Sequence, residues 1–263
     1  MSQARYVTAT FSSRTLTTNF AGAGSGSLSS SPDGIACSSP SSCSATYQNN
    51  QVVTLTAVAA SGSQFSGWSG VGSEACDDSA VTCAVTMSAD RTITATFVLT
   101  YELSITKVGG STSTVSADSG PLSCASGCAA GSQTYASGTV VVLTATPGSG
   151  YRFTGWSGGV CSGTGTCSVT MNAAKSVTAT FVRTYDLTVV VERPFLSSSS
   201  VSRSVPGGTV TSDCSFLGSD CVTYDVDTVV TLTATAQSGE TFDGWYNPSP
   251  DDTTFSGCLV SWR

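Results

Sequence analysis

The stretch Ile93-Thr-Ala-Thr-Phe97 decides the fold, because the same alternation of apolar residues with threonine returns at residues 7–11 and 177–181. A Phe-x-Gly-Trp turn also occurs three times, and its tryptophans lie 88 and 89 residues apart. These tryptophans are Trp68, Trp156 and Trp245. Such a period indicates an array of structural repeats.

The segments between the turns alternate with a period of two, are rich in Val, Thr and aromatic residues, and are bounded by Gly, Ser and Pro. This pattern is typical of short strands, and no helical period of useful length competes with it. We therefore predict an all-β protein of three small tandem modules stapled by disulfides. The expected divisions are an N-terminal strand at 1–14 that completes a repeat, then repeats at 15–98, 99–181 and 182–263.

The alternation continues across the ends of the first two repeats. Alternate residues are apolar from Ile93 to Ile105 and again, apart from one arginine, from Val177 to Val191. A single strand is thus predicted to run from each repeat into the next, and such a chain forms a stiff, extended rod. A short turn after Phe97 or Phe181 is the alternative. Between residues 12 and 16 the alternation of apolar and polar residues shifts by one residue, which predicts a bulge or bend.

The composition excludes several classes of function. The formal net charge is −7 with ten Lys plus Arg, so the basic stripe that nucleic acid requires is missing. The sequence has no histidine, the commonest general base and metal ligand. No apolar run is long enough to span a membrane as a helix. We expect no enzymatic activity, no cofactor and no metal.

Eleven cysteines occur mostly as close pairs, at two places in each repeat. The pairs are Cys37/Cys43, Cys76/Cys83, Cys124/Cys128, Cys161/Cys167 and Cys214/Cys221, with Cys258 left alone. Their spacing varies too much for the tight Cys-x2-Cys of a zinc knuckle, so disulfides are favoured, and with them an extracellular or cell-surface location. Crossed pairing between the two cysteine loops of a repeat stays open, and Cys258 is expected to be unpaired.

These motifs resemble those of a known family. The order Tyr-x-Leu-x-Val/Ile, a cysteine pair, Val-x-Leu-Thr-Ala, Phe-x-Gly-Trp-Ser-Gly, Cys-x-Val-Thr-Met and Lys-x-Val-Thr-Ala-Thr-Phe is similar to the divergent internalin-type B-repeat. It is clearest in residues 101–181. The resemblance implies a β-rich module used in tandem as a stalk or spacer on exported bacterial proteins, without a reaction of its own.

The third repeat departs from this pattern. It has no closing Val-Thr-Ala-Thr-Phe strand, and residues 246–252 replace the Ser-Gly and cysteine that follow the other tryptophans. Counted from the last cysteine, Trp262 corresponds to Met87 of the first repeat, and Met1 has the same place relative to residues 7–11. The chain is thus expected to begin at the point of the repeat where it stops.

A module without its closing strand exposes an edge, which proteins avoid or use for pairing. We predict that residues 3–11 fill this gap in a neighbouring identical subunit, so that head-to-tail contacts build an extracellular filament. The expected donor residues are Arg5, Val7, Ala9 and Phe11, and the expected acceptor residues are Phe242, Trp245, Leu259 and Trp262.

Two alternatives to the filament stay open. In the first, the chain is a stalk or spacer fragment of a larger surface adhesin, with surface glycans as partners. In the second, it closes into a ring. The tryptophans are expected in the core rather than in a carbohydrate-stacking row. The acidic pairs 77–78 and 251–252 are expected in solvated loops rather than around calcium. Lys107 and Lys175 differ in their place in the repeat, which argues against a shared isopeptide bond.

Overall fold

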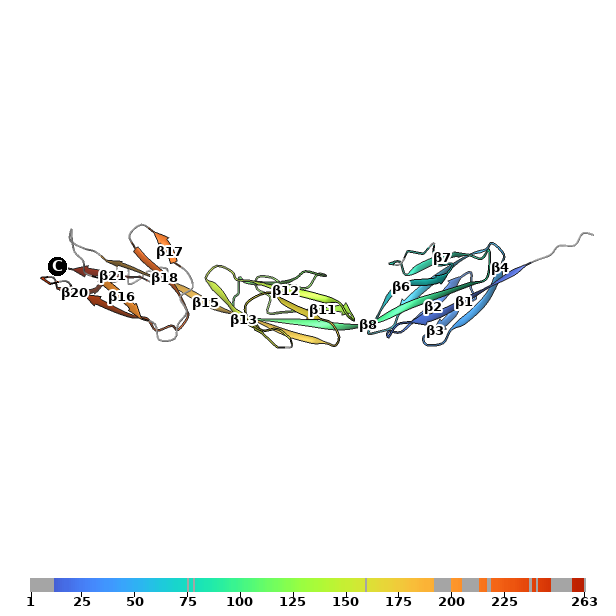
Figure 1. The fold of residues 1–263 in the computed structure, drawn as a ribbon, viewed down its shortest axis with the longest axis horizontal. Coiled ribbons are helices and arrows are strands. Elements are labelled where there is room, and N and C mark those ends of the chain that lie inside the picture. The colour runs from blue at the N-terminus through green and yellow to red at the C-terminus, as the bar shows by residue number, and fades with distance from the viewer. Residues whose placement is uncertain are drawn as a thin grey trace, which may run out of the picture. The chain divides into compact units, whose positions relative to one another are not determined.

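The computed structural model describes residues 12–74, 76, 77, 79–158, 160–191, 200–204, 213–216, 219–236, 238, 239, 241–246 and 257–262. Every regular element within these residues is a β-strand (Figure 1). No helix with the length and apolar character needed to cross a membrane is found among them. The predicted all-β class is confirmed.

The chain divides into two compact units. The first contains Met1–Ser104, Ser132–Val141 and Val169–Lys175, and the second contains Ile105–Gly131, Val142–Ser168 and Ser176–Arg263. Strands of the second repeat therefore contribute to both units.

Two sheets form the body of the first unit. One has the order β6-β8-β1-β4, and the other has the order β3-β2-β5-β7. The strands of the first sheet are β1 (Ser13–Ala21), β4 (Cys43–Gln48), β6 (Ser63–Val71) and β8 (Arg91–Val108), and those of the second are β2 (Gly26–Ser31), β3 (Ala36–Ser38), β5 (Val52–Ala59) and β7 (Thr82–Thr86). β1 and β8 are parallel, with Leu16 opposite Arg91 and Ala21 opposite Thr96, because the last strand of the repeat returns beside the first. The bulge expected near residue 16 does not occur, since β1 pairs with β4 in unbroken register from Ser13.

The core lies between these sheets and uses the predicted alternation. In β5 and β7 every second residue is buried, and the same residues face the apolar side of β8. The fully buried large side chains of this core are Leu16, Leu28, Ile35, Val53, Leu55, Met87, Ile93 and Phe97. Burial of an aliphatic or aromatic side chain contributes about 1.5–3 kcal/mol, so this cluster is a large favourable term in the folding of the first repeat.

The second repeat has the same order of elements. Its strands after β8 are β9 (Thr114–Ala117), β10 (Ser123–Cys124), β11 (Ala130–Ala136), β12 (Val140–Thr146), β13 (Tyr151–Ser157), β14 (Cys167–Thr170) and β15 (Lys175–Val191). β11 pairs with β8, β13 pairs with β15, and a sheet of order β10-β9-β12-β14 lies opposite. β14 and β12 correspond to β7 and β5 of the first repeat.

The third repeat belongs to the second unit. Its strands are β16 (Ser200–Ser204), β17 (Asp213–Phe216), β18 (Ser219–Asp225), β19 (Thr231–Thr235), β20 (Phe242–Tyr246) and β21 (Gly257–Trp262). β15 pairs with β18 and β21, β20 pairs with β21, and β16 pairs with β19.

Two strands are shared between neighbouring repeats. β8 is 18 residues long and β15 is 17, and each runs without a break from the end of one repeat into the next (Figure 1). The prediction of continuous strands is confirmed, and the alternative of a turn after Phe97 or Phe181 is wrong.

Candidate functional site

The first joint between repeats is centred on Leu99 and Thr100 in the middle of β8. The Thr100 amide donates to the carbonyl of Gly62 at 2.9 Å, in the turn that precedes β6. The Leu99 carbonyl accepts from the amide of Ser137 at 2.7 Å, in the turn that follows β11. Two successive residues of β8 are thus bonded to turns of different repeats.

The second joint, centred on Arg183 and Thr184 in β15, repeats this arrangement. The Thr184 amide donates to the carbonyl of Gly150 at 2.9 Å, and the Arg183 carbonyl accepts from the amide of Val226 at 2.8 Å. No unpaired linker residue separates the partners of either joint, so bending there would break backbone hydrogen bonds.

An ion pair reinforces the second joint. Arg152 Nε donates to Asp225 Oδ1 at 3.0 Å and Arg152 Nη2 donates to Asp225 Oδ2, and both side chains are about three-quarters buried. This bidentate contact raises the pKa of Arg152. The corresponding residues of the first joint are Gln64 and Ala136, which cannot form an ion pair. Among the described residues, this ion pair is thus present at the second joint and has no counterpart at the first.

The tryptophans of the first two repeats are core residues. Trp68 and Trp156 are each 5% exposed, and each ring packs at a steep angle against the phenylalanine three residues before it. The indole of Trp68 donates to the carbonyl of Ala80 at 2.9 Å, and that of Trp156 donates to the carbonyl of Gly165 at 2.6 Å. These acceptors lie in the second cysteine loop of each repeat, so the loop covers the ring. An exposed row of stacking tryptophans is therefore not present in these two repeats.

Trp245 differs from its two counterparts. Its side chain is 40% exposed, and it stacks edge-to-face on Phe242 with ring centroids 5.2 Å apart. Phe242 is 37% exposed. This aromatic pair keeps the geometry of the earlier repeats with less cover above it.

The disulfides close within the cysteine loops. The structure joins Cys37 to Cys43, Cys76 to Cys83, Cys124 to Cys128, and Cys161 to Cys167. The crossed pairing left open by the sequence does not occur among these eight residues. In the third repeat the backbones of Cys214 and Cys221 lie opposite each other across β17 and β18. A bridge there, and the unpaired state of Cys258, stay predictions.

The expected acceptor site requires a correction. β21 pairs with β20 so that Phe242 lies opposite Trp262, with the same register shift at the following glycine as in the pairing of Phe65 with Phe97. β21 is also parallel to β15, as β8 is parallel to β1. The third repeat therefore has a closing strand of its own, and the prediction that it lacks one is wrong.

The reason for the error is the length of one connection. Residues 72–90 separate β6 from β8 and residues 158–174 separate β13 from β15, but only residues 247–256 separate β20 from β21. Trp262 therefore corresponds in register to Phe97 rather than to Met87. Leu259 lies in β21 opposite Tyr246, inside the repeat rather than at a vacant position. The predicted donor residues Arg5, Val7, Ala9 and Phe11 lie outside the described residues.

The charged candidates are held by local contacts. Asp77 accepts from the amide and the hydroxyl of Ser79, which lowers the pKa of Asp77. Lys107 is buried, and its Nζ donates to the carbonyls of Ser113 at 2.7 Å and Ala125 at 3.0 Å. No group of three metal-ligating side chains occurs in the described part of the chain. Asp78 and residues 251–252 lie outside it.

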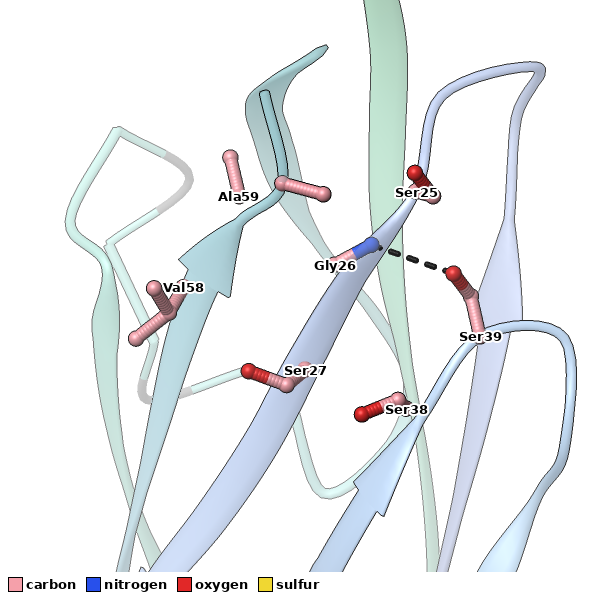
Figure 2. A pocket seen from close by; sticks show the side chains of 8 residues that line it. Ser25, Gly26, Ser27, Ser38, Ser39, Val58 and Ala59 are labelled. Carbon is pink, nitrogen blue, oxygen red and sulfur yellow. Dashed lines mark hydrogen bonds between the residues drawn. The ribbon is translucent and has the colours of Figure 1, made fainter. Parts of the chain in front are cut away.

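A shallow hollow of about 370 Å³ lies over the ends of β2, β3 and β5 (Figure 2). Its rim carries the hydroxyls of Ser27 and Ser38, and Ser39 accepts a hydrogen bond from the amide of Gly26 at 3.1 Å. Val58 and Ala59 line the other side. The lining holds no titratable side chain, so it offers neutral hydroxyls and apolar surface only.

Solved structures that resemble the chain include a protein of Bacillus anthracis and two streptococcal pilins. The TIE protein of Bacillus anthracis is 13% identical with a TM-score of 0.27, and the match covers 88% of this chain and 46% of that one. A streptococcal ancillary pilin is 10% identical with a TM-score of 0.28, covering 96% and 99%. The major pilin T-13 of Streptococcus pyogenes is 12% identical with a TM-score of 0.26, covering 65% and 97%. The chain thus spans about half the length of the TIE protein.

No curated protein matches the sequence. The model of the divergent InlB B-repeat domain matches three stretches, residues 16–100, 112–184 and 202–256, and each overlaps one of the three predicted repeats. These stretches include most of the chain and contain the Phe-x-Gly-Trp turns, the paired cysteines and the first part of each shared strand. The chain belongs to the divergent InlB B-repeat family.

Proposed function

We propose that this chain is a structural spacer, a stalk segment that holds other parts of an exported protein at a distance. The observation that carries this proposal is the sharing of β8 and β15, each paired on both sides through the joint. A flexible linker is rich in glycine and serine and has a solvated backbone. In these joints the backbone is instead hydrogen-bonded on both sides, which suits a segment that keeps a fixed length under force.

The proposed location is outside the cell, at or beyond its surface. The cystine bridges of the first two repeats support this, because such bonds persist in oxidising compartments and are rare in the cytosol. The proposal assigns no reaction to the repeats. Histidine is missing from the sequence, and the serines of the hollow in Figure 2 have no base beside them in the lining.

The stiffness of the joints can be tested by insertion. Adding Gly-Gly-Ser between Leu99 and Thr100 would interrupt β8 where it changes partners, and we expect the small-angle X-ray scattering profile to change from that of one defined arrangement to that of a broad ensemble. The matched control places the same tripeptide between Ser88 and Ala89, in an exposed turn inside the first repeat. Circular dichroism confirms that both variants stay folded. Equal profiles for the two insertions would contradict a stiff joint.

Head-to-tail assembly by donated strands is a second candidate. Residues 5–11 carry the alternation of a closing strand, which supports donation. However, β21 holds the closing position of the third repeat, so a donated strand would have to displace it. This requirement makes the spacer the better-supported function.

Electron microscopy of the chain, beside a variant that lacks residues 1–11, separates the two candidates. We expect dispersed particles from both samples. Fibres from the full chain and none from the truncated one would overturn the spacer as a sufficient account and establish strand donation, with Val7, Ala9 and Phe11 at the interface.

A further inference from the structure

Within the described residues, the third repeat has a sheet edge without a paired strand, whereas the other two repeats cover the corresponding edge. In the first repeat β7 pairs with β5, and in the second β14 pairs with β12. The corresponding strand of the third repeat, β19, pairs with β16 on one side. Among the described residues, no strand pairs with its other side.

The turn before β19 has the same backbone conformation as the turns that bind the covering strand in the first two repeats. Asn50, Gly138 and Asp227 occupy the same turn with positive φ values of 65°, 87° and 63°. In the first repeat the Asn50 amide donates to the Met87 carbonyl at 2.9 Å. In the second the Gly138 amide donates to the Met171 carbonyl at 2.8 Å. No described residue accepts from the Asp227 amide.

The side chains along this edge are also less covered. Leu55 and Leu143 are fully buried in β5 and β12, whereas the corresponding Leu232 of β19 is partly exposed. Leu232 lies on the apolar face of β19, so this face is less covered than its counterparts in β5 and β12.

The connection that contains the covering strand in the first two repeats is shorter in the third. In the first repeat, β7 and the turn that leads from it to β8 use nine residues, 82–90. The loop between β6 and β7 must in addition span the length of β7 before that strand begins. Ten residues, 247–256, connect β20 to β21, so one would remain for that return path. A five-residue strand is about 17 Å long, and one residue spans at most about 3.6 Å. Residues 192–199 and 205–212 flank β16, which lies on the other side of β19.

We propose that the open edge of β19 pairs with β19 of a second copy of this chain, antiparallel about a two-fold axis. Residues 229–235, Val-Val-Thr-Leu-Thr-Ala-Thr, contain no charge and no proline, the devices by which proteins keep edge strands apart. The edge is self-complementary, because a two-fold axis at Leu232 places Thr231 of one copy opposite Thr233 of the other. The joined sheet would have the order β16-β19-β19-β16, four strands like its counterparts in the first two repeats. This dimer does not depend on the spacer function.

Sedimentation velocity over a range of concentrations tests the proposal with one double variant. Thr231→Lys/Thr233→Lys places lysines opposite each other across the axis, and like charges directly opposite destabilise a strand pair. We expect a reversible dimer of the unmodified chain and a dissociation constant at least about tenfold higher for the variant, as for a cost near 1.4 kcal/mol. The matched control is Thr54→Lys/Thr56→Lys at the same positions of β5, whose edge β7 already covers. It should dimerise like the unmodified chain.

Hydrogen exchange gives a second readout that does not need a variant. The amides of Val230, Leu232 and Ala234 point to the open edge, as Ala57 of β5 donates to Val81 beside β7. We expect their protection to rise with concentration as the dimer forms. A monomer at all concentrations, protection that is independent of concentration, or a dimer insensitive to the lysines would each overturn the proposal.

Discussion

Replacing Trp156 by alanine is expected to destabilise the second repeat by about 3–5 kcal/mol, the range for loss of a buried tryptophan. The ring is nearly fully buried, contacts Phe153 at a centroid distance of 5.1 Å, and donates to Gly165 in the loop above it. Alanine would leave a cavity beneath that loop and an unpaired carbonyl. Urea unfolding, with hydrogen exchange of the β13 and β15 amides to locate the effect, measures the loss.

Trp245→Ala is the matched control, because Trp245 follows the same Phe-x-Gly turn in the third repeat. Its ring is 40% exposed, so less apolar surface returns to water and we expect a loss below about 2 kcal/mol. Equal losses at the two positions would contradict the assignment of Trp156 to the core and of Trp245 to a thinly covered surface.

The shared strands could be predicted from the sequence, because the signal is local. Alternation of apolar and polar residues is a property of the strand itself, and no glycine or proline interrupts it between Ile93 and Ile105. The same holds for the buried positions of Trp68 and Trp156, which follow from a turn motif that recurs with the repeat. A pattern that lies within the sequence of one module can be recognised without knowing which strands that module pairs with.

The closing strand of the third repeat could not be predicted in this way. Its sequence around Leu259 and Trp262 lacks the Val-Thr-Ala-Thr-Phe motif, and counting from Cys258 placed it one element too early. Register is set by pairing with β20, where Trp262 takes the place of Phe97, and that pairing is not visible in residue spacing. A shortened loop therefore looked like a missing strand.

The ion pair at the second joint was missed for a related reason. Arg152 and Asp225 are 73 residues apart, and no other repeat has charges at these positions. A repeat pattern predicts what modules share, so an interaction present once has no periodic signal. The only available hint was that charged residues are scarce, at 10% of the chain.

In the first two repeats a glycine follows the first strand and packs against the closing strand, and Gly22→Ala is expected to destabilise the first repeat by about 2–5 kcal/mol. Gly22 has a φ of +86°, and a Cβ there would overlap the carbonyl oxygen of Phe97 in the closing strand. Gly109 has a φ of +71° and meets the carbonyl oxygen of Phe181 in the same way. A side chain in this conformation costs about 1–2 kcal/mol, and the overlap adds roughly 1–3 kcal/mol.

Gly62→Ala separates the two contributions, since Gly62 has a φ of +76° but no atom within 4 Å of an added Cβ. It should cost only the conformational part, about 1–2 kcal/mol, in urea unfolding followed by circular dichroism. The difference between the two variants then measures how closely the turn after β1 packs on the closing strand. If Gly22→Ala cost no more than Gly62→Ala, Phe97 would have moved away from the turn. The parallel pairing of β1 with β8, which places the first and last strands of a repeat side by side, would then not be rigid.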